Sequence, residues 1–284
     1  MTEFQHKIDF KLVFAAHNAN PNGDPLNGNR PRQNFAGYGE VSDVAIKRKI
    51  RNRLQDLGNP IFVQSNDRND DGLDSLRARV ESIPELKKNK DADDYARIAC
   101  ATWLDVRAFG QVFAFKGDAS KGVSVPVRGP VSIQIAESVN PITINDMQIT
   151  KSVNSEPGGG RGSDTMGTKH FVDFGYYVVN GSINTQLAEK TGFSEEDAEQ
   201  IKQALLTLFE NDASSARPEG SMEVVKLFWW THPSKLGKYP AARVHRSVQV
   251  VPVDSDIVPT KADDYRLEVV DELPGVTRNV YPED

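Results

Sequence analysis

A basic segment near the N-terminus is the part of this sequence with the clearest chemistry. Between residues 30 and 53 the chain carries seven bases against two acids, Glu40 and Asp43, so five positive charges are uncompensated. The bases are Arg30, Arg32, Lys47, Arg48, Lys49, Arg51 and Arg53. Closely spaced guanidinium and ammonium groups bind the phosphates of a nucleic acid without reading its bases. The segment therefore predicts a contact with a nucleic-acid backbone.

The overall charge of the 284-residue chain, −6, does not contradict this prediction. Residues 254–284 hold nine acids and three bases, which accounts for the entire excess of negative charge. The rest of the chain is neutral on balance, so the isoelectric point says little about the partner. We interpret residues 254–284 as an acidic C-terminal tail.

The residue pattern predicts no metal site and no cofactor. Cys100 is the only cysteine, which excludes an internal disulfide and a cysteine-based zinc site. The five histidines lack the spacing of zinc ligands, and no glycine-rich loop matches a nucleotide-binding pattern. The first residues do not resemble a signal peptide, and no apolar stretch is long enough to cross a bilayer. We therefore expect a cytoplasmic protein without a membrane partner.

The basic groups have to be positioned by a mixture of strands and helices. Apolar periodicity predicts strands at about 7–17, 123–135, 142–144, 171–179, 224–230 and 242–253, and helices at about 43–57, 95–104 and 194–211. Turn-forming residues predict loops at 18–29, 65–74 and 116–122. Residues 152–168 are rich in glycine and serine and lie between two strands, which predicts a projecting hairpin. The order of elements favours an α+β sandwich with helices on one face of the sheet.

The first predicted helix carries three of the seven bases. It should begin at Ser42 or Asp43, and its apolar stripe consists of Ile46, Ile50, Leu54 and Leu57. Lys47, Arg48 and Arg51 lie off this stripe. We therefore expect these three side chains to face outward.

Three segments together resemble the backbone subunit of the type I CRISPR Cascade, subtype I-C. They are residues 20–25 (NPNGDP) with 29–32 (NRPR), residues 41–52 (VSDVAIKRKIRN), and residues 165–170 (TMGTKH) with 175–177 (GYY). The resemblance extends over most of residues 7–253 and leaves out the acidic tail. The sequence departs from the pattern at Gln33, where an acid is expected, and at Thr168, where a base is expected. The second departure puts one phosphate contact in doubt.

The resemblance implies a fold and a function. The fold would be α+β: a modified RNA-recognition-motif (ferredoxin-like) palm in a single domain over residues 1–253. Finger-like insertions would lie at about 58–140 and a thumb-like hairpin at about 150–170. Several copies would stack head to tail along one CRISPR RNA (crRNA) guide, kink it, and expose its spacer bases for pairing with target DNA in an R-loop during antiviral defence. Other partners would be the guide 5′-handle subunit, the large subunit and the small subunit.

On this interpretation the chain is not an enzyme, and its site is a track for RNA. A subunit that accepts any spacer must hold phosphates and sugars and leave sequence recognition to base pairing. Cationic side chains would hold phosphates, Asn20 and Ser42 would donate neutral hydrogen bonds, and Met166 would act as an apolar wedge at a kink. The candidate RNA-binding residues are Asn20, Arg30, Arg32, Ser42, Lys47, Arg48, Arg51, Met166, Lys169 and His170.

Each of these features also has a purely structural interpretation. A basic amphipathic helix is more often a solvated face than a binding site. Asp24 in its Asn-Gly-Asp turn would then cap backbone amides, Met166 would fill the core, and His170 would be a hydrogen-bonded structural histidine.

Two other classes of function compete with an RNA-binding backbone. The first is a metal-assisted ribonuclease that uses Asp24, because related subunits of type III complexes cut RNA with an acid in a comparable loop; no second acid follows before Glu40. The second is a self-assembling structural protein in which residues 228–230 (FWW) and the acidic tail make subunit contacts. The tail would alternatively shield the basic segment before assembly.

Overall fold

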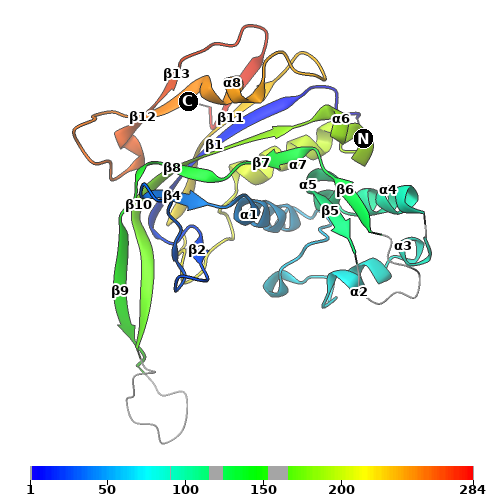
Figure 1. Cartoon of the computed structure of the whole chain (residues 1–284), viewed down its shortest axis with the longest axis horizontal. Helices are drawn as coiled ribbons and strands as arrows, with labels where there is room; N and C mark the ends of the chain where they lie inside the picture. The colour runs from blue at the N-terminus through cyan, green and yellow to red at the C-terminus, as the bar shows by residue number, and fades with distance from the viewer. Residues whose placement is uncertain (1, 90, 115–123, 153–165, 284) are drawn as a thin grey trace, which may run out of the picture.

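The centre of the molecule is an antiparallel sheet. Two helices connect its strands in the order of a ferredoxin-like fold. The computed structural model describes residues 2–89, 91–114, 124–152 and 166–283. The sheet order is β14-β11-β1-β10-β8-β4, and β7 and β9 also pair with β10 (Figure 1). The strands are β1 (Ile8–Ala19), β4 (Tyr38–Val41), β7 (Val131–Ile133), β8 (Ala136–Pro141), β9 (Ile144–Thr150), β10 (Met166–Ile183), β11 (Met222–Thr231) and β14 (Thr277–Tyr281). Helix α1 (Asp43–Asp56) follows β1, and α7 (Glu195–Leu206) connects β10 to β11, so β11-β1-β10-β8 corresponds to the ferredoxin-like pattern. The predicted α+β palm is confirmed.

One face of the sheet packs against helices. Phe10, Leu12 and Phe14 alternate along β1 and are fully buried, as the period of two in a strand requires. Phe14 stacks on Tyr177 of β10 with ring centroids 5.2 Å apart. The helices that cover this face are α1, α5 (Leu104–Phe109), α6 (Thr185–Thr191) and α7.

The opposite face of the sheet is covered as well, by the C-terminal part of the chain. This outer layer consists of α8 (Ala241–Arg246), β12 (Val248–Pro252), the 3₁₀ turn η3 (Ala262–Asp264) and β13 (Tyr265–Val269). Tyr265 stacks on Tyr176 of β10 with centroids 4.4 Å apart, and Leu273 is buried beside Trp230 of β11. An RNA-recognition motif stacks bases on aromatic side chains of an open sheet face. With both faces of this sheet covered, any RNA must be bound elsewhere.

Two predictions about the C-terminal third were wrong in detail. The predicted tail of residues 254–284 contains β13 and β14, which pair with β12 and β11, because its apolar residues complete the outer layer. The strand predicted at 242–253 begins as helix α8, since Pro240 and the alanines after it favour a helical start. The aromatic residues 228–230 are buried in the core and are not available for subunit contacts.

A segment between α1 and β7 forms a second small core beside the palm. It contains η1 (Asn66–Arg68), α2 (Leu76–Glu81), α3 (Pro84–Lys88), α4 (Ala92–Thr102), β5 (Gly110–Phe113) and β6 (Val125–Arg128). Phe62 packs on Trp103 at 4.7 Å and on Phe113 at 5.2 Å between ring centroids. The helix predicted at 95–104 is observed as α4, and the loop predicted at 116–122 lies outside the described residues. The finger-like role of this segment stays a prediction.

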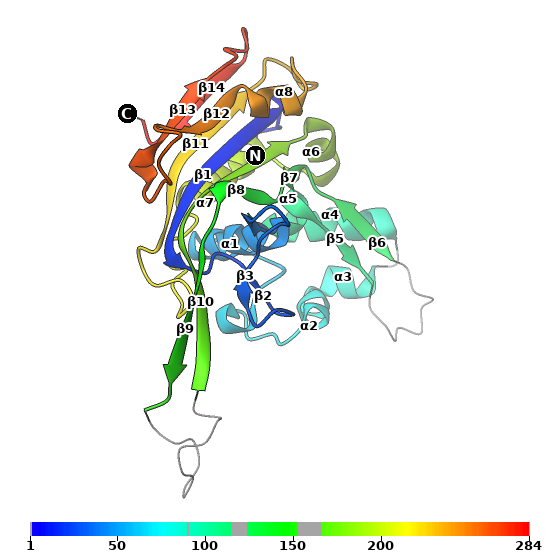
Figure 2. The same ribbon diagram turned by 60° about the vertical axis from the view of Figure 1, so that its left-hand side comes forward.

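A two-stranded arm of β9 and β10 projects from the palm (Figures 1 and 2). The arm corresponds to the predicted hairpin, although most of its glycine- and serine-rich tip lies outside the described residues. At the base of the arm, β2 (Gly23–Asp24) and β3 (Arg30–Pro31) form a short hairpin. The arm and this short hairpin place several candidate RNA-binding residues side by side.

Candidate nucleic-acid interface

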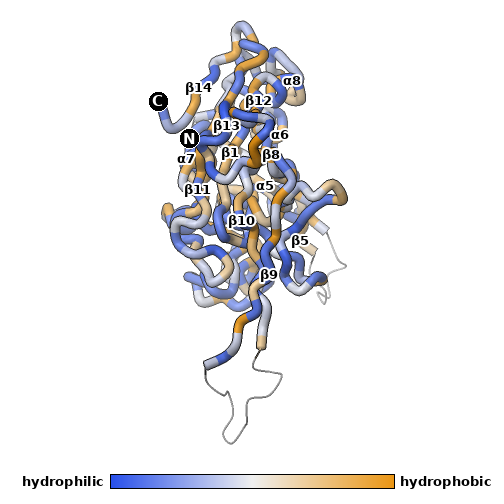
Figure 3. The backbone as a smooth tube through the Cα atoms, turned by 90° about the vertical axis from the view of Figure 1, so that its left-hand side faces the viewer, coloured by the Kyte–Doolittle hydropathy of each residue, from blue (hydrophilic) through white to orange (hydrophobic). Residues whose placement is uncertain are grey.

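The strand register of the arm assigns its side chains to two faces. Met166 pairs with Thr150, Lys169 with Met147, and His170 with Asp146. Because side chains alternate along a strand, Met166, Asp146 and His170 lie on one face. Met147, Ile149 and Lys169 lie on the other face. Figure 3 shows apolar and polar residues mixed along the arm.

Met166 is exposed on the arm, so the alternative interpretation, in which it fills the core, was wrong. Its sulfur accepts a hydrogen bond from the Gln148 amide at 3.2 Å. On the other face, Met147 and Ile149 are also exposed, and Lys169, opposite Met147, is half-buried. Exposed aliphatic side chains on a projecting arm are unusual in a soluble monomer and indicate a surface that another molecule covers.

A carboxylate at the base of the arm brings two candidate residues together. Arg30 Nη1 of β3 donates to both oxygens of Asp146 at 2.5 Å, and His170 Nδ1 lies 2.6 Å from Asp146 Oδ1. The bond from Arg30, and then the bond from His170, lower the pKa of Asp146 below its usual value. The structural interpretation of His170 is therefore supported. Asp146 was missed in the sequence, although its position opposite His170 would have shown it once the strands were aligned.

The loop between β1 and β4 is fixed by its own polar side chains. Asn20 is buried, and its amide donates to the carbonyl of Asn29 at 2.6 Å. A Cβ at Gly23 would lie 3.0 Å from the same carbonyl and closer still to the side-chain amide of Asn29, so a larger residue would require Asn29 to shift. The predicted exposed donor at Asn20 was wrong, because this side chain shapes the loop from inside.

The same loop is connected to the N-terminus of α1. The Ser42 backbone amide donates to Asn22 Oδ1 at 2.9 Å, and Ser42 Oγ caps the helix by accepting from Ala45 N at 3.3 Å. Asp24 Oδ1 accepts from the backbone of Leu26 at 3.2 Å and from Arg32 at 3.4 Å. Asn20, Arg30, Arg32, Ser42 and His170 therefore form one connected region.

The bases of α1 do not face outward as predicted. Arg48 Nη1 donates to the carbonyl of Val63 at 2.6 Å, and burial, followed by the nearby Arg51, lowers the pKa of Arg48. Arg51 Nε donates to Asp105 Oδ2 at 2.8 Å, and Lys47 pairs with Asp43 at 3.0 Å. The inserted segment packs against this flank of the helix, which helical periodicity alone does not reveal. Leu57, predicted on the apolar stripe, is exposed.

Asp105 explains why Arg51 is held so firmly. The carboxylate is fully buried and accepts from the backbone amides of Phe62 at 2.7 Å and Val63 at 3.1 Å, as well as from Arg51. The Arg51 guanidinium also lies over the Phe109 ring, 5.0 Å from its centroid. Arg51 therefore connects α1 to the inserted segment.

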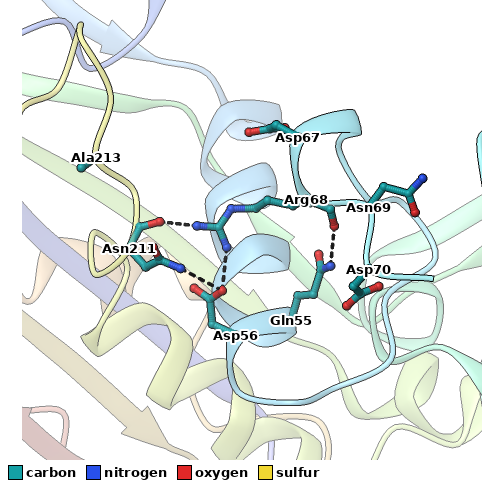
Figure 4. Close-up of a pocket in the computed structure, with 8 residues that line it drawn as sticks. All are labelled: Gln55, Asp56, Asp67, Arg68, Asn69, Asp70, Asn211 and Ala213. Carbon is teal, nitrogen blue, oxygen red and sulfur yellow. Dashed lines mark hydrogen bonds and ion pairs between the residues drawn. The ribbon is translucent and has the colours of Figure 1, made fainter. Parts of the chain in front are cut away.

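A hollow of about 550 Å³ lies at the C-terminal end of α1 (Figure 4). Arg68 crosses it and bonds to Asp56 at 2.6 Å and to the Asn211 carbonyl. Asp67 and Asp70 also line it, so acids outnumber bases. This hollow is poorly suited to a phosphate group.

The described residues contain no cluster of three histidine, cysteine or acidic side chains placed to hold a metal ion. Within the same part of the chain, no helix is long and apolar enough to cross a membrane.

A sheet covered on both faces, with a projecting arm and a polar loop at its base, defines a protein with a palm like that of an RNA-recognition motif. The profile of one protein family, CRISPR-associated protein Cas7, matches residues 6–270, and the chain belongs to this family. The match continues past residue 253 into the predicted tail, in agreement with the folded β13.

Known proteins show the same relationship. The chain is 26% identical over 226 residues to the CRISPR-associated protein Cas7 of Haloferax volcanii, and the aligned region covers 74% of this chain and 66% of that protein, slightly less than two thirds. In fold it is similar to a chain of a CRISPR RNA-guided surveillance complex, pre-nicking, with a TM-score of 0.50 and 18% identity. That alignment covers 79% of this chain and 75% of the other.

Proposed function

We propose that this protein is the non-catalytic backbone subunit of a subtype I-C CRISPR surveillance complex in the cytoplasm. Copies assemble along a crRNA guide, kink it, and present its spacer bases to target DNA, together with a guide 5′-handle subunit, a large subunit and a small subunit. Membership of the Cas7 family over residues 6–270 carries the proposal. The three sequence segments quoted above support the subtype.

The geometry supports an RNA track along the arm and its base. Arg30 and Arg32 lie on the short hairpin, and each retains guanidinium N–H groups beyond those bonded to Asp146 and Asp24. Lys169 lies further out on the arm, and no ion pair is recorded for it within the described residues. A series of cations on neighbouring strands suits consecutive phosphates, whereas no open aromatic sheet face is available to stack bases.

Arg48 and Arg51 stay proposed RNA contacts, but alanine substitutions there cannot test the track. Removing Arg51 leaves the buried Asp105 carboxylate without its charge partner, so loss of RNA would also follow from loss of folding. Lys169 and Met166 are better positions because both are on the projecting arm and neither supports the palm core.

The test is to purify the tagged protein from cells that carry its own CRISPR array and to sequence the bound RNA. We expect uniform guides that contain spacers. The double variant Lys169→Gln, Met166→Ala should bind the same guides more weakly, and removal of one phosphate contact should reduce the slope of log affinity against log salt by roughly 0.7–1. Lys190→Gln on α6, an exposed lysine far from the arm, is the matched control. Absence of RNA, or random fragments only, contradicts the proposal.

A further inference from the structure

The outer layer has opposite charges at its two ends. Residues 235–246, just before β12, contain four bases and no acid, whereas residues 254–264, just after β12, contain four acids and one base. A five-residue strand spans roughly 17 Å, so the two segments are well separated. Figures 1 and 2 both show α8 and the loop between β12 and β13 at opposite ends of this strand.

At the first end, which we call the basic end, charge and apolar surface occur together. Lys238 and Arg246 are exposed, and neither forms an ion pair within the part of the chain that the structure describes. Leu236 is 80% exposed, and Val270, whose amide donates to the Ser247 carbonyl, is exposed beside α8. Two cations and two exposed aliphatic side chains therefore occur at this end of the outer layer.

Other charges at the basic end are already matched. Arg243 pairs with Asp271 at 2.8 Å and lies over the Tyr239 ring at 4.5 Å. Lys235 pairs with Glu3 and Glu189. The net positive charge of this end therefore comes from Lys238 and Arg246.

The second end, which we call the acidic end, is the loop between β12 and β13. Asp254 and Asp256 are exposed, and Asp263 is exposed with Lys261 at 3.9 Å. Val258 is 80% exposed and Ile257 beside it is exposed as well. Asp264 is engaged internally, because it accepts from the amides of Thr260 and Lys261.

We propose that the acidic end of one copy docks on the basic end of the next copy, with Ile257 and Val258 packing against Leu236 and Val270. Aliphatic residues surrounded by charged residues are the composition of a protein interface with an apolar centre and a polar rim. A nucleic acid would match only the basic end and would leave its aliphatic residues without a role. The charge of each end matches the other end, so a second copy of this chain satisfies both.

A contact between two different surfaces repeats in one direction and builds an open array. The complementary charges would set the register of neighbouring copies and speed their encounter more than they would raise the affinity. This inference rests on the proposed function in one respect, because the guide RNA would hold the copies beside one another.

The test exchanges charges between the ends. Variant A carries Asp254→Lys and Asp256→Lys, and variant B carries Lys238→Glu and Arg246→Glu. In A both ends are positive and in B both are negative, so each variant alone should self-associate at least about tenfold more weakly than the wild type. A mixture of A and B restores opposite charges at every contact and should regain wild-type assembly. Native mass spectrometry of the guide-bound complex counts the copies, and sedimentation measures RNA-free protein.

The control Glu85→Lys, Asp93→Lys changes the net charge as A does, at exposed positions on α3 and α4 of the inserted segment, and should assemble as the wild type does. Wild-type assembly of A or B alone, or a mixture that fails to recover, overturns the docking. If assembly does not follow these expectations but A and B still bind as much guide RNA per copy as the wild type does, the docking is wrong and the proposed function is not affected. If A or B does not fold, Leu236→Cys and Val258→Cys proteins take their place. A short bis-maleimide should then link the mixed pair but neither protein to itself.

Discussion

Two single carboxylates, buried Asp105 and exposed Asp146, explain more of this molecule than the basic residues that dominate its sequence. Asp105 and Asp146 each fix cations that the sequence alone presents as free. The first holds Arg51 of α1, and the second holds Arg30 and His170 at the base of the arm. A cation counted in a sequence offers RNA only the donors and the exposed surface that the fold leaves to it, and its pairing with an acid depends on contacts distant in the chain.

Asp105→Ala should destabilise the protein by about 3–5 kcal/mol, because it leaves the Arg51 guanidinium half-buried without its partner and two backbone amides without an acceptor. The measurement is urea unfolding of the full chain. Asp93→Ala on α4 is the control, since an exposed acid should change stability by less than about 0.5 kcal/mol. Equal stabilities of the two variants would show that Asp105 does not hold the inserted segment.

Asp24→Asn should leave RNA integrity unchanged. The Asp24 carboxylate is occupied by the Leu26 amide and Arg32, which is the arrangement of a turn cap. The measurement is gel analysis of labelled guide and target RNA incubated with Mg²⁺ and either protein. Cleavage by the wild type that disappears in the variant would revive the ribonuclease alternative.

At the scale of elements, local sequence patterns were sufficient to predict a helix or strand where its own residues determine which face is buried. The alternation of β1, the Ser42 cap of α1 and the presence of a hairpin between two strands could be predicted from the sequence. The strands of the arm extend beyond the predicted 142–144 and 171–179. The partial burial of Arg48 and Arg51 could not, because they bond to Val63 and Asp105 through long-range contacts, whereas Lys47 pairs with Asp43 of the same helix. Helix α8 was mistaken for a strand since a six-residue helix has no clear period.

Lys11 couples the sheet to the outer layer in a way that depends on pH. Its ammonium group is buried and donates to the Val248 carbonyl of β12 at 2.6 Å, and burial lowers its pKa from 10.5 to about 8. Between pH 8 and 10.5 the unfolded chain therefore binds more protons at Lys11 than the folded chain does. The free energy of unfolding should rise with pH over this window. The titratable groups packed nearby are Lys7, Asp9, His232 and His245.

The measurement compares urea unfolding of wild type and Lys11→Met at pH 7.5 and 9.5. The wild type should gain more stability than the variant, because methionine removes one titrating site and leaves the others in place. Lys49, whose pKa burial also lowers to about 8, is present in both proteins and cancels in the comparison. An identical pH dependence would show that burial does not lower the pKa of Lys11 in the folded protein.

At the scale of the whole molecule, the C-terminal segment changes from an appendage into part of the fold. Its acids suggested a tail, but Tyr265, Leu267 and Leu273 contribute to the apolar cluster beneath the outer layer. Net charge reflects composition alone. It does not show which of the apolar residues among the charged ones pack against the rest of the protein. The open face expected of an RNA-recognition motif is closed by this segment, and for this reason we propose the projecting arm as the surface for RNA.

Truncation after Val253 should therefore unfold the outer layer. Removal of a tail that only shields the basic segment would instead leave the fold intact and increase RNA binding. The deletion removes β13 and β14 and exposes Tyr176 and Trp230, which are buried in the full chain. We expect aggregation or strong binding of a hydrophobic dye, together with loss of the near-ultraviolet circular dichroism of the aromatic residues. Truncation after Pro282 removes two acids but keeps the Pro282 carbonyl that accepts from Lys226 at 3.0 Å, and it should fold normally. A stable monomer that lacks residues 254–284 and binds more nonspecific RNA would restore the shielding interpretation.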